Sequence, residues 1–357
     1  MFARNTKIGW SLFVLVSVLF SSFAMGQTEV ALVAARHVPG SFVGDRAVWA
    51  DENRIYTGSF EGYVSVYSRN RSQNFPFVER IDIDPAGNAS IVSVRGDKEC
   101  LYVLTDDGKL RTFKKSFPCL QFVRTEQVST SGADSLVLAD KHTFVSSGQA
   151  EMDVDQTRVY FSPLNEGDLA CGFAGRVMKT SSRPTIYGVG SEPGFTSVYD
   201  RKTGGLVGSI ANPQGIQQVA IYGDATRLFL TVPGPFGQGI AIHNKSDLSP
   251  NRFVWFYGTN VVTNAKGGKA SDDKDLIVVG TEAGTVDLLD LNLNYPNSPH
   301  ISCVNLRVLT GHTGPEDIEI RALWCDGLDN LVFAVSSGGN QQPQNPNLPT
   351  FFVIEVR

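Results

Sequence analysis

The feature that most constrains this chain is a strand–turn–strand pattern that recurs along its length. Its clearest copy, LTGHTGPEDIEIRALWCDGLDNLVFAVSSGG at 309–339, has an apolar segment, a short turn with Asp and Gly, and a second apolar segment that ends in small residues. Seven copies can be recognised, and steps of 46, 41, 42, 44, 48 and 55 residues separate the predicted starts of their second strands. These starts lie near Arg54, Cys100, Lys141, Arg183, Arg227, Asp275 and Asn330.

A period of roughly 40–50 residues with this content is typical of β-propeller blades, each of which is a four-stranded antiparallel sheet. Polar and apolar residues largely alternate in YVSVYS and TVDLLDL, as expected for strands. The turns FEG, DDG and EAG place glycine where a tight hairpin needs a positive φ. The sequence therefore predicts an all-β fold, a seven-bladed β-propeller of four-stranded antiparallel blades, with no helix after the N-terminal segment.

The two ends of the chain are predicted to share one blade. The final TFFVIEVR supplies a third strand for the last copy, and VALVAARHVPG near the N-terminus resembles VNLRVLTGHTG, which we interpret as an outer strand. We expect 30–37 to form the outermost strand of the last blade, because joining the ends in this way closes the ring and removes its open sheet edges.

The first 26 residues have the pattern of a cleavable secretory signal. Arg4 and Lys7 precede an apolar stretch, and the small residues Ala24 and Gly26 stand at −3 and −1 of a cleavage point before Gln27. The alternative is a retained membrane anchor, since the stretch approaches spanning length. Residues 1–26 are thus predicted to be a signal peptide and 27–357 a single propeller domain, secreted or periplasmic, with no membrane span after signal removal.

The charge balance argues against nucleic acid as a partner. Removing residues 1–26 takes away two of the 31 basic residues and none of the 36 acidic ones, which leaves a net charge of −7. Such a chain repels phosphate backbones, and it carries no local basic cluster. The oligomeric state cannot be deduced from these features.

Five cysteines raise the question of disulfides in an exported chain. An odd number leaves at least one thiol unpaired. We expect Cys100 to pair with Cys119, since both fall within one copy, and Cys303 with Cys325 across adjacent copies. The alternative is that all are small buried hydrophobic residues.

The repeats resemble those of a known superfamily. The copy at 309–339 resembles a WD-repeat blade, and GTEAGTVDLLDL is similar to the second half of one, whereas YVLTDDGKLRTF and YDRKTGG look like quinoprotein-type propeller repeats. The resemblance covers about residues 30–357 and implies a structural role for Gly311 and His312. In that family, the histidine of the Gly-His pair forms a hydrogen bond within its own blade. The tryptophan docking motifs of its quinone-dependent enzymes are missing.

No catalytic motif accompanies the repeats. The sequence has no G-x-S-x-G, HExxH or CxxC, and its five histidines show no metal spacing with one another. We therefore predict no catalytic residue, no metal site and no cofactor.

Loop lengths are the remaining signal for a binding face. The turns between second and third strands are long in the third, fifth and seventh copies and intermediate in the fourth, and long loops on one face of a rigid ring are common binding sites. The predicted ligand contacts are Asp153, Asp155, Phe195, Phe236 and Gln342. The leading hypothesis is a scaffold that binds a protein, peptide or glycan. The alternatives are a lactonase-type or quinoprotein-like enzyme with a metal or cofactor at the ring centre, and a structural part of an envelope assembly.

Overall fold

A computed structural model describes most strands of the chain. The described residues are 29–37, 44–86, 88–116, 119–128, 135–139, 142–147, 157–163, 168–172, 177–179, 185–189, 195–200, 206–211, 221–223, 227–232, 239–244, 246–255, 259–264, 275–281, 283–293, 299–310, 318–325, 329–337 and 349–357. Only the backbone is described for 135–223, apart from Leu136 and Ile210, and for 231–232, 259–264 and 337.

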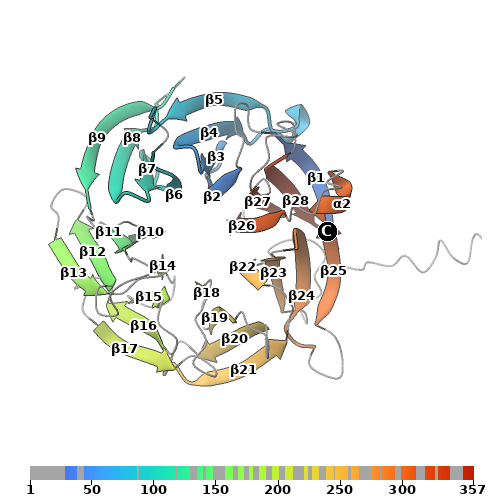
Figure 1. The fold of residues 1–357 in the computed structure, drawn as a ribbon. Coiled ribbons are helices and arrows are strands. Elements are labelled where there is room, and N and C mark those ends of the chain that lie inside the picture. The colour runs from blue at the N-terminus through green and yellow to red at the C-terminus, as the bar shows by residue number, and fades with distance from the viewer. Residues whose placement is uncertain are drawn as a thin grey trace, which may run out of the picture.

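The described strands form seven four-stranded antiparallel sheets, which we call blades 1 to 7 (Figure 1). Blade 1 holds β2 (Asp45–Ala50), β3 (Arg54–Ser59), β4 (Tyr63–Ser68) and β5 (Phe77–Asp82), and blade 2 holds β6 (Ile91–Gly96), β7 (Cys100–Thr105), β8 (Lys109–Lys114) and β9 (Gln121–Gln127). Blade 3 holds β10 (Ser135–Ala139), β11 (His142–Ser147), β12 (Thr157–Pro163) and β13 (Asp168–Gly172), and blade 4 holds β14 (Val177–Lys179), β15 (Thr185–Val189), β16 (Phe195–Asp200) and β17 (Leu206–Ala211). Blade 5 holds β18 (Ile221–Gly223), β19 (Arg227–Val232), β20 (Gly239–Asn244) and β21 (Pro250–Trp255), and blade 6 holds β22 (Thr259–Asn264), β23 (Leu276–Thr281), β24 (Thr285–Asp290) and β25 (His300–Asn305). Blade 7 holds β26 (Glu319–Trp324), β27 (Leu331–Ser337), β28 (Phe351–Val356) and β1 (Val30–Arg36).

The predicted period matches the observed strands. Each second strand (β3, β7, β11, β15, β19, β23 and β27) begins within two residues of its predicted start. The turns after three of these strands use the predicted glycines, Gly62, Gly108 and Gly284, at φ of 79°, 78° and 76°. This left-handed backbone costs glycine little and other residues more, so these positions fix the hairpins that align second and third strands.

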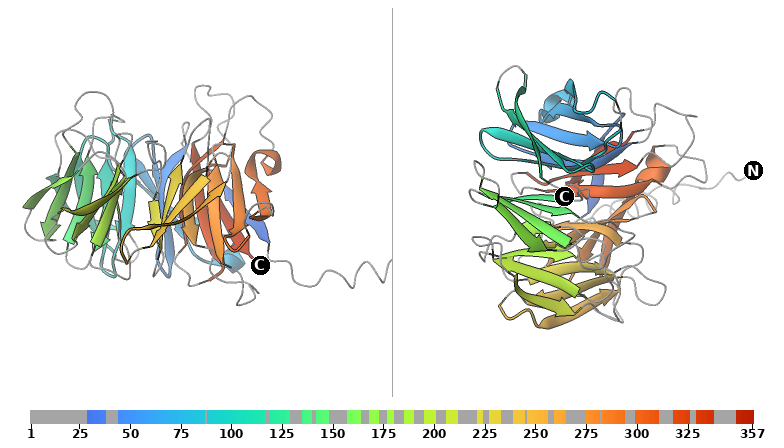
Figure 2. Two further views of the ribbon diagram at one scale, coloured as in Figure 1. Left: turned by 90° about the horizontal axis from the view of Figure 1, so that it is seen from below. Right: turned by 60° about the vertical axis from the view of Figure 1, so that its left-hand side comes forward.

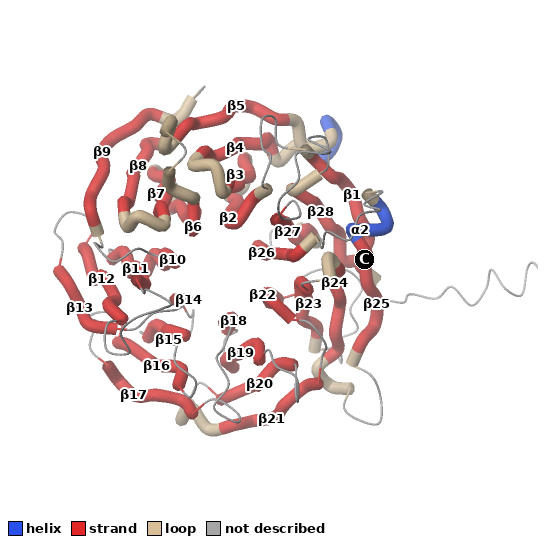
Figure 3. The backbone as a smooth tube through the Cα atoms, viewed as in Figure 1, coloured by secondary structure: helices blue, strands red, loops and turns tan. Residues whose placement is uncertain are grey.

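The N-terminal strand lies where the sequence places it. β1 pairs antiparallel with β28 from Val30 opposite Val356 to Arg36 opposite Phe351, so it is the outermost strand of blade 7. The comparison used to predict it was only half right, because the quoted segment VNLRVLTGHTG is not one outer strand. It begins as the end of β25 and continues as a short helix, α2 (Leu306–Leu309), in which the side chain of Asn305 accepts a hydrogen bond from the Val308 N–H. The expectation of no helix is wrong at this point and at a 3₁₀ turn, η1 (Arg71–Gln73), both visible in Figure 3.

The blades pack side by side around a common centre, and side views show them as one layer (Figure 2). Their innermost strands contact one another in sequence: β2 with β6, β6 with β10, β10 with β14, β14 with β18, β18 with β22, β22 with β26, and β26 with β2. The hydrophobic cores lie between blades. One such core packs blade 7 against blade 1 through Phe333, Phe351, Tyr67 and Ile55, all essentially inaccessible to solvent. Where side chains are described, the sheets thus bury their apolar faces against their neighbours.

The structure joins neither predicted disulfide pair. Cys100 and Cys119 are free thiols; Cys100 begins β7, Cys119 precedes β9, and β8 lies between these strands. Cys303 is also a free thiol, on the outer strand β25, whereas Cys325 follows the innermost strand β26 of the next blade. In the described part of the chain there is no helix of a length and apolarity suited to crossing a membrane.

Candidate functional site

Three innermost strands end in large side chains at equivalent positions. Trp49 and Arg95 are the next-to-last residues of β2 and β6, and Trp324 is the last residue of β26. Each lies opposite an aromatic residue of the second strand: Trp49 opposite Tyr56, Arg95 opposite Tyr102 and Trp324 opposite Phe333. Because blades 7, 1 and 2 are neighbours, these equivalent positions meet at one end of the inner strands. We call Trp49, Arg95 and Trp324 the inner-strand cluster.

Trp49 is the packed centre of this cluster. Its ring centroid lies 5.5 Å from that of Tyr56, which it stacks upon, and 6.3 Å from that of Trp324. The ammonium of Lys115 sits 4.3 Å from the Trp49 ring centre, within the range of a cation–π interaction. Gly96 makes this packing possible, since a Cβ at that position would lie 2.6 Å from two carbons of the indole.

Arg95 carries a positive charge that the described residues do not pair. One Nη donates hydrogen bonds to the backbone carbonyls of Val94, at 2.8 Å, and Val48, at 3.4 Å, and the guanidinium lies 5.2 Å from the Trp324 ring centre. Burial lowers the pKa of Arg95 to about 10, so the group stays charged at neutral pH. No carboxylate in the described part of the chain pairs with it.

Trp324 offers a second unsatisfied donor beside this charge. Its indole Nε1 is buried and has no hydrogen-bond partner among the described residues. An unmade hydrogen bond at a buried donor costs about 1–3 kcal/mol, and a desolvated charge costs more. The inner-strand cluster therefore has two donors, a guanidinium and an indole N–H, whose hydrogen-bonding capacity the described residues leave partly unused.

Two other cations that lie between blades, Lys115 and Arg69, do pair with carboxylates, and Lys115 of blade 2 is the first example. Lys115 follows β8 and donates to Asp51 Oδ2 in blade 1 at 2.8 Å and to the Asp97 carbonyl in its own blade at 2.6 Å. Burial raises the pKa of Asp51, but hydrogen bonds from Lys115 and from the Asn53 N–H outweigh this effect and bring it below the usual value. Asp51 in turn accepts from the Tyr56 hydroxyl at 3.3 Å.

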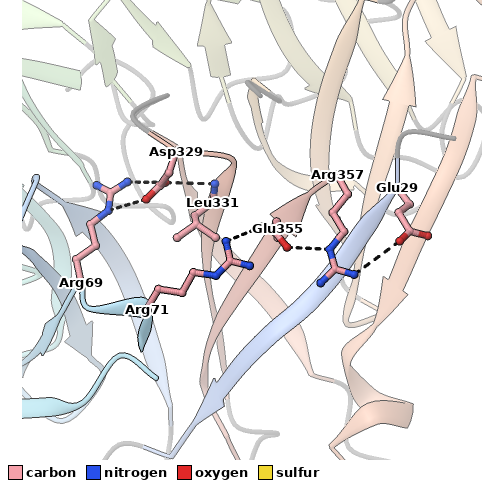
Figure 4. Close-up of polar contacts among 7 residues, drawn as sticks. All are labelled: Glu29, Arg69, Arg71, Asp329, Leu331, Glu355 and Arg357. Carbon is pink, nitrogen blue, oxygen red and sulfur yellow. Dashed lines mark hydrogen bonds and ion pairs between the residues drawn. The ribbon is translucent and has the colours of Figure 1, made fainter. Parts of the chain in front are cut away.

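Arg69 occupies the corresponding place after β4 and repeats this arrangement at the junction of blades 7 and 1. Two nitrogens of its guanidinium donate to the Asp329 carboxylate of blade 7, at 2.7 and 3.3 Å, and a third contact reaches the Asp51 carbonyl at 2.8 Å. Figure 4 shows that further ion pairs line the same junction, where Arg71 meets Glu355 at 2.6 Å. Arg95 differs from these cations, because no described carboxylate pairs with its guanidinium.

The cluster and the predicted ligand contacts belong to opposite faces. Inner strands end on the face that carries the turns between first and second strands, whereas the long loops predicted to bind ligand join second and third strands. Four of those predicted contacts, Asp153, Asp155, Phe236 and Gln342, lie outside the described residues, as do Gly311 and His312. Phe195 begins β16, where only the backbone is described. These assignments stay predictions.

The sequence does mark the positions of the inner-strand cluster, although the strands that contain them are mostly apolar. Aligned copies read Trp49-Ala-Asp51, Arg95-Gly-Asp97 and Trp324-Cys-Asp326, so each residue of the cluster precedes an aspartate by two positions. Comparing the copies column by column would have identified this position. Its unpaired donors, however, follow only from the packing of three blades.

Comparison with solved structures identifies the architecture. The chain is similar to the WD40 domain of Neurospora crassa Pan2, with 9% identity and a TM-score of 0.67 over 93% of this chain and 96% of that one. It is also similar to Chaetomium thermophilum Raptor, with 12% identity and a TM-score of 0.68 over 100% of this chain and 33% of that one. The fold is a WD40-type β-propeller.

Sequence comparisons add no closer relationship: no family model matches the chain, and no match to a curated protein was found. At identities this low, the structural likeness establishes the fold and leaves the activity open. The quinoprotein-like character of some repeats stays a prediction.

Proposed function

We propose that this chain is an exported interaction scaffold, a closed seven-bladed propeller that binds a protein or peptide through a carboxylate. WD40-type folds offer a rigid ring of sheets, and binding residues gather where the ring presents several strand ends together. The inner-strand cluster is such a place, formed by three consecutive blades. The long loops of the opposite face are a second predicted contact surface for the same partner or for another one, including a glycan.

The observation that carries the proposal is the guanidinium of Arg95, which pairs with no carboxylate among the described residues, close to the Trp324 indole N–H, which has no hydrogen-bond partner among them. An arginine in partly desolvated surroundings gains most from a carboxylate, which accepts two parallel hydrogen bonds from it. The partly exposed ring of Trp324 would pack against the aliphatic part of an aspartate, a glutamate or a chain terminus. The ligand class that this arrangement favours is therefore an acidic peptide segment.

The test is binding of peptides to the mature chain, residues 27–357. A peptide array that contains acidic sequences and their Asn/Gln counterparts would first select a binder, and tryptophan fluorescence would then measure its affinity. We expect binding to require a carboxylate, and Arg95→Gln to weaken it by about 2 kcal/mol, or roughly 30-fold, as for other charged hydrogen bonds.

Arg124→Gln is the matched control, because Arg124 lies on the outer strand β9 and pairs with Glu126 there. This variant should bind as tightly as the unaltered chain. Binding that survives Arg95→Gln, or that ignores exchange of carboxylates for amides, would argue against the site. Export is tested separately by the mass of the mature chain, which should begin at Gln27.

A further inference from the structure

A cluster of metal-binding side-chain types lies on the outer half of blade 6, a blade that contributes no residue to the inner-strand cluster. Asp287 belongs to β24, and His300 and Cys303 belong to β25, the outermost strand of the blade. One carboxylate oxygen, one imidazole nitrogen and the sulfur all lie within 4.8 Å of one another. The spacing of the five histidines did not reveal this cluster, because the cluster contains only one histidine, together with an aspartate and a cysteine.

The register of the two strands explains why these side chains meet. Asp287 lies directly opposite Cys303, so their side chains share one face of the sheet. His300 precedes Cys303 by three residues, a spacing that would place it on the other face of a regular strand. A register shift between Leu288 and Leu289 inserts one residue into β25 and sets His300 opposite Leu289. Since Leu289 and Asp287 are two residues apart, the bulge returns His300 to the face of Asp287 and Cys303.

The carboxylate is held in place before any ligand arrives. The Asp287 side chain is 8% exposed, and its Oδ1 lies 2.8 Å from His300 Nε2. The Thr285 hydroxyl donates to Oδ2 at 2.5 Å and lies 2.8 Å from the Thr281 hydroxyl. Such supporting hydrogen bonds orient a metal ligand and reduce the cost of organising the site. His300 and Cys303, by contrast, are exposed enough to receive an ion from solvent.

We propose that Asp287, His300 and Cys303 form a Zn²⁺ site. One oxygen, one nitrogen and one sulfur donor suit this borderline-soft ion, whereas Mg²⁺ and Ca²⁺ favour oxygen donors alone. Three protein ligands leave the fourth tetrahedral position to water. On binding, the Cys303 thiol releases its proton to solvent, and His300 Nε2 exchanges its hydrogen bond with Asp287 for the metal.

Titration of the reduced, chelator-treated chain 27–357 with Co²⁺ tests the site directly. We expect one ion per chain, with the charge-transfer absorption of a thiolate ligand and the visible bands of tetrahedral cobalt, and displacement of Co²⁺ by Zn²⁺. Cys303→Ser should abolish the thiolate absorption. His300→Ala should weaken binding at least ~10-fold, the lower range for a disturbed metal site.

Cys119→Ser and His37→Ala are the matched controls, because they remove an exposed cysteine and a histidine from other parts of the fold. Both should bind Co²⁺ as the unaltered chain does. The exposed positions of His300 and Cys303 allow their variants to fold, which circular dichroism would verify. Absence of metal binding, or a thiolate band that persists in Cys303→Ser, would overturn the assignment. Either result leaves peptide binding at Arg95 unaffected, since that site uses other blades.

Discussion

At the scale of single residues, Asp45 makes the stability of this fold depend on pH. It begins β2 and is fully buried. Thr350 donates to its Oδ2 at 3.2 Å, but Oδ1 has no hydrogen-bond partner among the residues that the structure describes. The pKa of Asp45 is raised from 3.8 to about 7, chiefly by burial and slightly by the charge of Glu61, against the lowering effect of the Thr350 and Thr57 hydroxyls. Between these two pKa values the folded state holds a proton that the unfolded state has released. Stability is therefore lost as the pH rises from about 4 to about 7.

The prediction concerns this carboxyl alone. Between pH 5 and pH 8 the unaltered chain should lose about 2.5 kcal/mol of unfolding free energy relative to Asp45→Asn, which cannot ionise. Urea denaturation at both pH values measures the difference. Asp82→Asn, at an exposed carboxylate paired with Arg80, should keep the pH dependence of the unaltered chain. Parallel pH profiles for the Asp45→Asn variant and the unaltered chain would show that Asp45 is already ionised at pH 5.

Individual residues also mark the limit of prediction from sequence. The sequence pattern describes the first segment of the repeat only as apolar, and it singles out neither Trp49 nor Trp324. Their importance depends on which blades are adjacent, because Arg95 of blade 2 reaches Trp324 of blade 7 past Trp49 of blade 1. Whether a donor finds a hydrogen-bond partner where three blades meet depends on how the blades pack. No local pattern in the sequence shows this.

At the scale of elements, strand positions could be predicted where two independent signals agreed. Three of the second strands, β3, β7 and β23, are followed by a glycine at positive φ, and these strands begin at or within one residue of their predicted starts. The outer segment around Asn305 carried only an apolar pattern, which fits either a strand or a helix. The Asn305 side chain caps the first turn of α2 and so favours the helix. An analysis of hydrophobic periodicity does not detect such a local hydrogen bond.

The junction of blades 7 and 1 allows a comparison of two arginines in one setting (Figure 4). The Arg69 side chain is 4% exposed, pairs with Asp329 and lies 5.1 Å from the Phe333 ring centre, whereas Arg71 is 56% exposed and pairs with Glu355. Arg69→Met removes charged hydrogen bonds to the Asp51 carbonyl and to Asp329, whose side chain is 41% exposed, and should cost about 2 kcal/mol. Arg71→Met should cost less than about 1 kcal/mol, as exposed ion pairs do. Urea denaturation of both variants tests the difference, and equal losses would show that burial does not decide the value of these pairs.

At the scale of the whole molecule, we expect the pairing of β1 with β28 to make the blades unfold as one unit. A stack of repeats with two free ends unfolds from those ends, whereas a ring whose first and last blades touch has no end from which to start. β1 contributes the buried Val30 and Ala34 to the cores on both sides of blade 7. Removal of β1 should therefore expose the outer edge of blade 7 and weaken its packing against blades 6 and 1. The ring would then behave as a row of blades with two free ends.

Deletion of residues 27–40 is the corresponding experiment, with deletion of 27–28, which precede β1, as its control. We expect the longer deletion to lower stability by on the order of 5 kcal/mol, from lost apolar burial and ladder hydrogen bonds. Amide hydrogen exchange should show the loss in β3 of blade 1 and β23 of blade 6 as well as in β27, because each neighbour of blade 7 becomes an end. If protection falls only in blade 7 while β3 and β23 exchange as before, the blades are independent and closure contributes nothing to their stability.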